Sequence, residues 1–95
     1  MSSATDQQAS PRHYLVLAMR KPGYSAAVIQ PHREFLAQLR ADGKLLMTGG
    51  FADASGGAYV LQGVASLAEA RALVARDPLA LQDASELTVY EWNTY

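Results

Sequence analysis

The sequence predicts one small α+β domain whose elements follow the order β-α-β-β-α-β and whose four strands form an antiparallel sheet. Three observations support this fold class. A chain of 95 residues has room for one hydrophobic core. Apolar residues make up 49% of it, which is too rich for a disordered chain. Four short strand-like segments alternate with two segments of helical apolar spacing.

The first strand is predicted over residues 13–19, with the sequence HYLVLAM. An almost unbroken apolar run, in place of alternation, indicates burial on both faces and therefore a central strand. Lys21-Pro22-Gly23 follows as a turn that ends the strand.

The first helix is predicted to begin at Pro31, because proline fits best at the first helical position. It runs to about Asp42, where Gly43 supplies a left-handed cap. Ahead of it, Ser25 could cap a short helical turn, but the proline is expected to hold Gln30 outside the helical region.

Strands are predicted over residues 44–49 and 58–63, joined by a loop over residues 50–57. Ser66 and Glu69 form a capping box that starts the second helix, and Pro78 is expected to end it. The last strand, residues 86–95, is rich in β-branched and aromatic residues.

This order favours a ferredoxin-like sheet, because crossovers are right-handed and connections are short. Both helices then cover one face of the sheet. The first and third strands carry apolar residues on both faces, and the last strand places Tyr90 and Trp92 opposite Leu87 and Val89. A second copy of the chain is the simplest cover for the remaining face, which predicts a homodimer through the sheet.

Composition argues against several functional classes. The formal charge is −1 and no window is strongly basic, so nucleic-acid binding is not expected. No cysteine and no apolar run of membrane-spanning length occur, which predicts a cytoplasmic protein without a membrane partner. Two histidines without regular carboxylate spacing argue against a metal site. Residues 1–11 read as a disordered tail, leaving residues 12–95 as the domain.

His32 is the first candidate for chemistry. It lies three, four and seven residues before Phe35, Leu36 and Leu39, which places its ring on the inward face of the first helix. A histidine at the edge of a core suits proton transfer. The alternative is a buried histidine satisfied by a single backbone hydrogen bond.

Asp77 is the second candidate, since an anion at the end of the second helix opposes the helix dipole. The alternative is a simple Asp-Pro helix stop. In this topology, the beginning of the first helix and the end of the second lie at the same end of the domain. His32 and Asp77 are therefore expected at one rim, where the carboxylate would fix the tautomer of the imidazole, as in a catalytic triad.

Two segments carry a resemblance to a known family. The proline-histidine helix start followed by FLAQLRADGKLLMTGGF, and the segment SLAEARALVARDP, resemble the YCII-related dimeric α+β barrel proteins. The resemblance covers roughly residues 14–95. It implies a homodimeric barrel with a His-Asp pair in a cleft, which corresponds to His32 and Asp77. The family is similar to chloromuconolactone dehalogenases and, more distantly, to muconolactone isomerases.

The chain departs from the family pattern at two places. Gly49-Gly50 and then Phe51 stand where the family commonly has glycine-proline, and Leu79 replaces a frequent aromatic after Asp-Pro. Both positions would line the cleft, so Gly49, Gly50 and Phe51 are predicted to contact a substrate whose class does not follow from the family.

The leading hypothesis is a cofactor-independent enzyme in which His32 performs acid-base chemistry on a small organic molecule and Asp77 orients the ring. Isomerisation, dehydrohalogenation and lactone hydrolysis are all open to such a pair. The alternative from another class is a non-catalytic homodimer that binds a small ligand or serves as an accessory module.

Overall fold

The computed structural model describes residues 12–95, so the predicted tail lies outside the described residues. The elements, in chain order, are β1 (Arg12–Arg20), η1 (Ala26–Val28), α2 (Ile29–Ala41), β2 (Leu45–Gly50), β3 (Gly56–Leu61), α3 (Leu67–Val74), α4 (Pro78–Leu81) and β4 (Ser85–Asn93). The predicted α+β fold class is confirmed.

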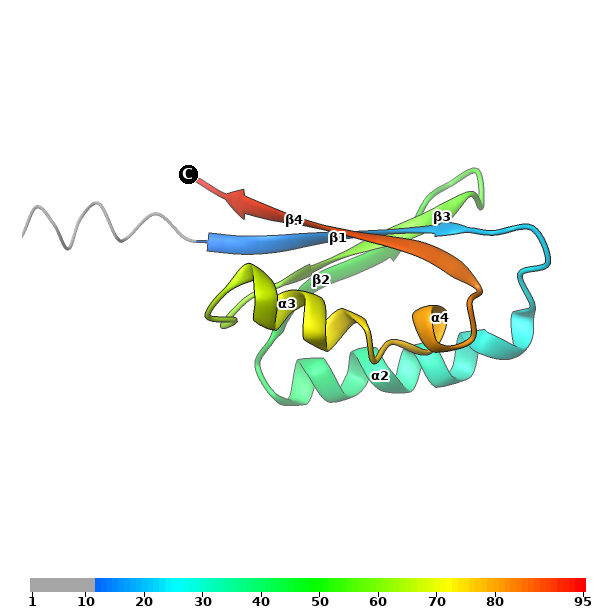
Figure 1. The fold of residues 1–95 in the computed structure, drawn as a ribbon, viewed down its shortest axis with the longest axis horizontal. Helices are drawn as coiled ribbons and strands as arrows, with labels where there is room; N and C mark the ends of the chain where they lie inside the picture. Colours follow the sequence, from blue (N-terminus) through cyan, green and yellow to red (C-terminus); the bar gives the residue numbers. More distant parts are fainter. Residues whose placement is uncertain (1–11) are drawn as a thin grey trace, which may run out of the picture.

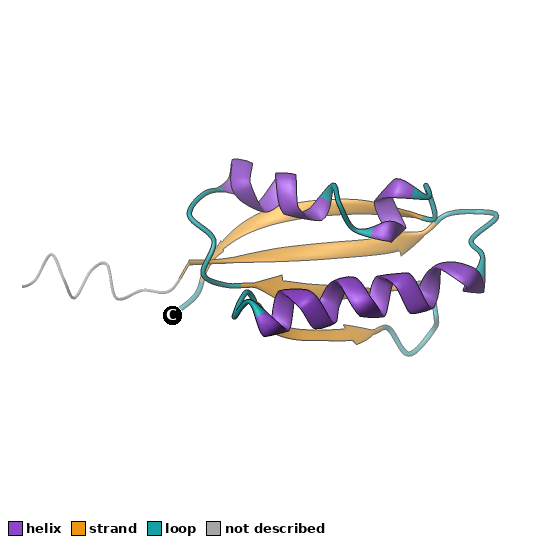
Figure 2. Ribbon diagram, turned by 90° about the horizontal axis from the view of Figure 1, so that it is seen from below, coloured by secondary structure: helices purple, strands orange, loops and turns teal. Residues whose placement is uncertain are grey.

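The four strands form one antiparallel sheet in the order β2-β3-β1-β4. All helices lie on one face of this sheet (Figure 1). Seen from the helix side, α2 lies over the β2-β3 half, while α3 and α4 lie over the β1-β4 half (Figure 2). The prediction that the first strand is central is confirmed, because β1 pairs with β3 on one side and β4 on the other.

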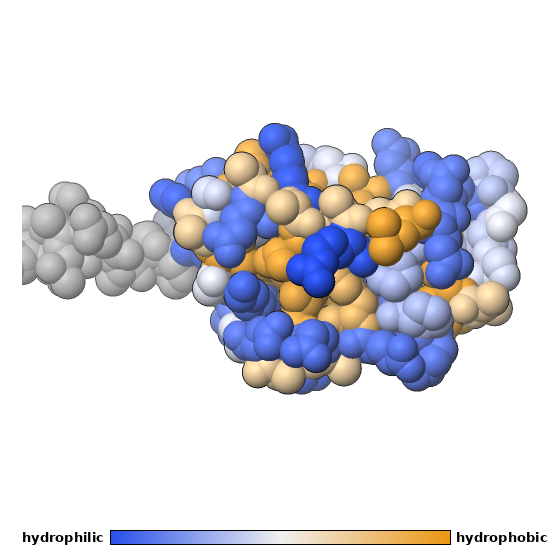
Figure 3. Space-filling model, turned by 60° about the horizontal axis from the view of Figure 1, so that its bottom comes forward, coloured by the Kyte–Doolittle hydropathy of each residue, from blue (hydrophilic) through white to orange (hydrophobic). Residues whose placement is uncertain are grey.

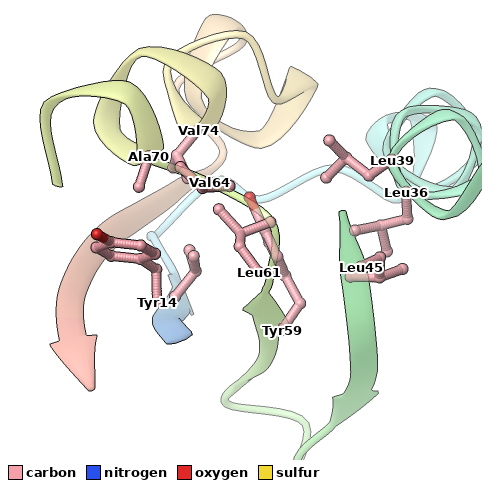
Figure 4. Packing of buried hydrophobic residues seen from close by; sticks show 10 residues of the cluster. Tyr14, Leu36, Leu39, Leu45, Tyr59, Leu61, Val64, Ala70 and Val74 are labelled. Atoms are coloured by element: carbon pink, nitrogen blue, oxygen red, sulfur yellow. The ribbon is translucent and has the colours of Figure 1, made fainter. Parts of the chain in front are cut away.

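The core lies between the sheet and the helices (Figure 4). Strand side chains alternate, so one set of each strand faces this layer. Tyr14 and Val16 of β1 and Tyr59 and Leu61 of β3 are almost completely buried there. Tyr59 rises from β3 with its hydroxyl directed towards the helices, away from Tyr14 (Figure 4).

The first helix begins earlier than predicted, and Gln30 is helical. Ser25 caps η1 by accepting a hydrogen bond from the backbone of Ala27, and η1 continues directly into α2. Pro31 is therefore the third residue of α2. The prediction for Gln30 was wrong because a proline in the first turn occupies a position whose N–H has no helical partner.

The second helix ends before Pro78. α3 stops at Val74, and Asp77 is the N-cap of α4, with Pro78 at its first position. The Asp-Pro pair was predicted as a stop, but it starts a new helix, where proline is favoured and an acidic cap is stabilising. The dipole argument for Asp77 is thus reversed, since the N-terminus of a helix attracts an anion.

The opposite face of the sheet has no helix over it. Leu15 and Leu17 of β1 are half-buried there, and the register places Leu15 between Tyr90 of β4 and Val60 of β3. Four further side chains of this face or its edges are 38% to 60% exposed: Met19, Met47, Tyr90 and Trp92. We call this the open sheet face.

Within residues 12–95, no helix combines the length and apolar character that crossing a membrane requires.

Candidate active site

Asp77 is a completely buried carboxylate whose position is fixed by the start of α4. As the N-cap, it adopts an extended backbone with φ −63° and ψ 131°. Its Oδ1 accepts a hydrogen bond of 2.8 Å from the backbone N–H of Leu79. Burial of a charged group is costly unless it is well paired, so its remaining contacts determine what it can do.

His32 supplies the second contact of this carboxylate. Its Nδ1 lies 2.9 Å from Oδ1 of Asp77, across 45 positions of sequence. An ionised carboxylate can only accept hydrogen bonds, so this contact assigns the proton to Nδ1 and leaves Nε2 as the acceptor in the neutral ring. The side chain of His32 is 20% exposed, so the ring bridges the buried acid and the surface.

Tyr59 supplies the third contact. Its hydroxyl donates to Oδ2 of Asp77 at 2.8 Å. The centroid of its ring lies 6.0 Å from the ring centroid of His32 and 6.5 Å from that of Phe35. Burial, together with the neighbouring carboxylate of Asp77, raises the pKa of the Tyr59 phenol far above its ordinary value. The phenol therefore remains a donor, and both oxygens of Asp77 are engaged.

A cavity of about 370 Å³ opens beside His32, between α2 and the ends of β1, β2 and β3. This volume is in the range of sites for small ligands. Glycines line the sheet side, and Ile29, Leu36 and Leu79 supply apolar walls. On the helix side, apolar surface lies between the helices and is bordered by hydrophilic side chains (Figure 3).

The glycines shape the cavity by the absence of side chains. A Cβ on Gly56 would lie 2.1 Å from the carbonyl oxygen of Ala18, and one on Gly57 would lie 2.5 Å from that of Gly49. Any side chain at these two positions would force the backbone to move. A Cβ on Gly50 would lie no closer than 3.9 Å to its nearest neighbour, the carbonyl oxygen of Gly56, so that position stays open for a ligand.

A model of the YCII-related domain family matches residues 12–93. The chain belongs to this family. It is 44% identical over 79 residues to the uncharacterized protein YjpA of Bacillus subtilis (strain 168), covering 83% of this chain and 92% of that protein. The family resemblance seen in the sequence is confirmed.

A solved structure supports the same fold. It is the 5-chloro-2-hydroxyhydroquinone dehydrochlorinase of Burkholderia phenoliruptrix AC1100, in complex with 2,5-dihydroxybenzoquinone. It aligns with a TM-score of 0.65 at 21% identity and covers 84% of this chain and 92% of its own. At this identity the likeness concerns the fold.

The structure places the residues predicted for the site as follows. His32 and Asp77 are in hydrogen-bonding contact, and His32, Gly49 and Gly50 line the cavity. Phe51 is 40% exposed and is not among the residues that line the cavity. Contact of these residues with a substrate stays a prediction.

Sequence reasoning did not identify Tyr59 as part of the site. Strand parity could have pointed to it, because Tyr59 shares the helix-facing side of β3 with Leu61. The arginines at the cavity, Arg20 and Arg33, were also missed. Residues 12–95 contain no cluster of three or more His, Cys, Asp or Glu side chains that could hold a metal ion.

Proposed function

We propose that this YCII-related protein is a cofactor-independent enzyme that transfers protons to and from a small organic substrate, with His32 as the acid-base group. One observation carries the proposal: a buried carboxylate, bound by two further donors, holds Nδ1 of a histidine that borders a cavity of ligand size.

The three groups that contact Asp77 have different roles: His32 transfers the proton, and Tyr59 and the N–H of Leu79 position the carboxylate. Nε2 of His32 accepts a proton from a substrate bound in the cavity, and the ring becomes an imidazolium. The adjacent charge of Asp77 stabilises that imidazolium and holds its orientation. Tyr59 and the N–H of Leu79 each donate a hydrogen bond to the carboxylate and hold it in place, so they are positioning groups. The imidazolium then returns the proton to another atom of the substrate, which completes the cycle.

Several reactions are compatible with this arrangement. A proton returned to a different carbon gives isomerisation, departure of a halide after proton removal gives dehydrohalogenation, and removal of a proton from water gives lactone hydrolysis. The dehydrochlorinase from Burkholderia phenoliruptrix shows that the fold can support the second of these. We propose this reaction class without assigning a substrate by analogy.

We further propose that two copies associate through the open sheet face to form a dimeric α+β barrel. Exposed Met47, Tyr90 and Trp92 and half-buried Leu15 and Leu17 supply a contiguous apolar surface. Contiguous apolar surface of this kind marks interaction sites, and about 800 Å² buried per partner is sufficient for a stable contact.

Proton transfer can be tested without knowledge of the final product. The protein is incubated in deuterated water with a panel of small keto acids, lactones and hydroxyquinones, and deuterium uptake or conversion is followed by NMR. We expect turnover of at least one compound by the parent. His32→Gln should reduce that rate by about 10²- to 10⁴-fold, because the acid-base group is lost.

The matched control is Arg40→Gln, an exposed residue of the same helix that does not line the cavity. It should retain the parent rate. Equal rates in the parent and His32→Gln would contradict the proposal. Tight binding of a panel member without any exchange or conversion would favour a ligand-binding module.

A further inference from the structure

The charged side chains that line the cavity carry one sign. Arg20, at the end of β1, and Arg33, in the first turns of α2, both line it, and neither Asp nor Glu is among the lining residues. Asp77 lies behind His32, with both oxygens engaged. This polarity contrasts with the chain as a whole, whose formal charge is −1.

Neither of these arginines is used in an ion pair within residues 12–95. In that part of the chain, Arg12, Lys21 and Lys44 each lie close to a carboxylate, those of Glu91, Asp83 and Glu69 respectively. No carboxylate of the described residues lies within 4.0 Å of the guanidinium of Arg20 or Arg33. Their positive charge is thus available to a ligand.

Arg20 is also held in place. Its guanidinium carbon lies 4.3 Å from the centroid of the Tyr24 ring, which also lines the cavity. The backbone N–H of Arg20 donates to the carbonyl of Ser55 at 3.0 Å, which fixes the end of β1 against the loop before β3. A stacked guanidinium keeps its in-plane N–H donors free for a planar anion, since the ring contacts only its face.

From these observations we infer the substrate class of the proposed site: a small planar organic oxyanion whose charged oxygens are bound by Arg20 and Arg33. Ile29, Leu36 and Leu79 contact its carbon framework, and the glycines give it room against the sheet. This inference rests on the proposed function only in calling the ligand a substrate. Binding of the anion does not require that His32 be catalytic.

The same arginines bear on proton transfer. When Nε2 of His32 takes a proton from a carbon next to a carbonyl group, the electron pair of the C–H bond moves into the substrate and its carbonyl oxygen becomes negative. A guanidinium beside that oxygen stabilises the charge as it develops. A substrate with both an acidic proton and an oxyanion therefore matches the whole cavity.

Binding of three probes of similar size tests the inference: benzoate, 4-nitrophenolate and the neutral benzamide. Each is titrated into the full chain while the backbone amide signals of Gly49, Gly50, Gly56 and Gly57 are followed by NMR. We expect saturable shifts with at least one anion and affinity at least about tenfold weaker for benzamide, because a charged hydrogen bond is lost. Tighter binding of benzoate assigns a carboxylate, and tighter binding of 4-nitrophenolate assigns an enolate or phenolate oxygen.

Variants locate the contact. Arg20→Gln and Arg33→Gln should each weaken binding of the anion by about tenfold, whereas Arg40→Gln on the outside of α2 should leave it unchanged. Arg20→Lys retains the charge but loses the planar fork, so it should fall between Arg20→Gln and the parent. Unchanged amide spectra away from the cavity verify that each variant is folded.

Equal affinity for benzamide and the anions, or anion binding that Arg20→Gln and Arg33→Gln leave intact, would overturn the inference. The two proposals fail separately. Anion binding without proton transfer in any screen would remove the enzyme but keep the oxyanion site. Turnover of neutral compounds without anion binding would remove the oxyanion site but keep the enzyme.

Discussion

Replacing Asp77 with alanine is expected to lower the free energy of unfolding by about 3 kcal/mol or more. The substitution removes one acceptor group and leaves three donors without it: the hydroxyl of Tyr59, the N–H of Leu79 and Nδ1 of His32. It also removes the N-cap of α4. Urea denaturation followed by circular dichroism measures the change.

Three further variants distinguish loss of the Asp77 hydrogen-bond network from the effect of removing any carboxylate or any tyrosine hydroxyl. Asp42→Ala removes an exposed carboxylate at the end of α2 and should remain close to the parent. Tyr59→Phe removes the hydrogen bond from Tyr59 to Asp77 and should lower the free energy of unfolding by about 1–3 kcal/mol. Tyr14→Phe should be neutral or stabilising, because the buried hydroxyl of Tyr14 has no hydrogen-bond partner in the described part of the chain. Equal losses of unfolding free energy in Tyr59→Phe and Tyr14→Phe would contradict the assigned network.

The double substitution Tyr90→Arg and Trp92→Arg is expected to convert the proposed dimer into monomers at micromolar concentration. Buried aromatic residues are frequent hot spots, and truncating one often costs about 2 kcal/mol or more of binding free energy. A two-fold interface would contain each substituted position twice, and like charges would then face each other across it. Sedimentation velocity over a concentration series measures the change, with an expected rise of at least about a hundredfold in the dissociation constant.

Leu81→Arg is the matched control for this prediction. Leu81 is exposed (70%), as are Tyr90 (50%) and Trp92 (46%), but it lies on α4 on the helix side of the sheet. Its substitution should leave the association state unchanged. A parent protein that is monomeric at high concentration, or a double variant that stays dimeric, would show that the open sheet face is not the interface.

Much of the fold could be predicted because strand and helix patterns are local. The unbroken apolar run in β1 reflects its position between two strands, and the capping pair Ser66 and Glu69 begins α3: the backbone N–H of Glu69 donates to the Ser66 hydroxyl. Glu69 itself accepts from the backbone N–H of Ala65. The register of the pleat then decides which residues face the helices.

The prolines were harder to interpret, because their effect depends on the neighbouring segment. Pro31 is compatible with a helix that begins before it, since η1 already provides helical backbone. Pro78 begins a helix of four residues, whose existence depends on packing against β4 and α2 as much as on its own sequence. Sequence pattern could not distinguish a stop from a start at that point.

The contact between His32 and Asp77 in the candidate site was predicted, but the groups around it were not. The predicted topology brings the beginning of the first helix and the Asp-Pro segment to the same end of the domain. His32 and Asp77 could therefore be predicted to lie close together. The roles proposed for Tyr59 and for the arginines rest on side-chain directions and three-dimensional distances, which spacing along the chain does not encode. Phe51 illustrates the same limit, because one step beyond β2 takes its side chain out of the cavity lining.

The tautomer of His32 tests the central claim most directly. Long-range ¹H–¹⁵N NMR of the neutral ring distinguishes a proton on Nδ1 from one on Nε2, and His13→Gln removes the other histidine signal. With Asp77 holding Nδ1, the spectrum should show the Nδ1–H form, with Nε2 unprotonated beside the cavity, and Asp77→Ala should abolish that preference. A neutral His32 protonated on Nε2 in the parent would contradict the account, because the nitrogen beside the cavity could not then act as a base.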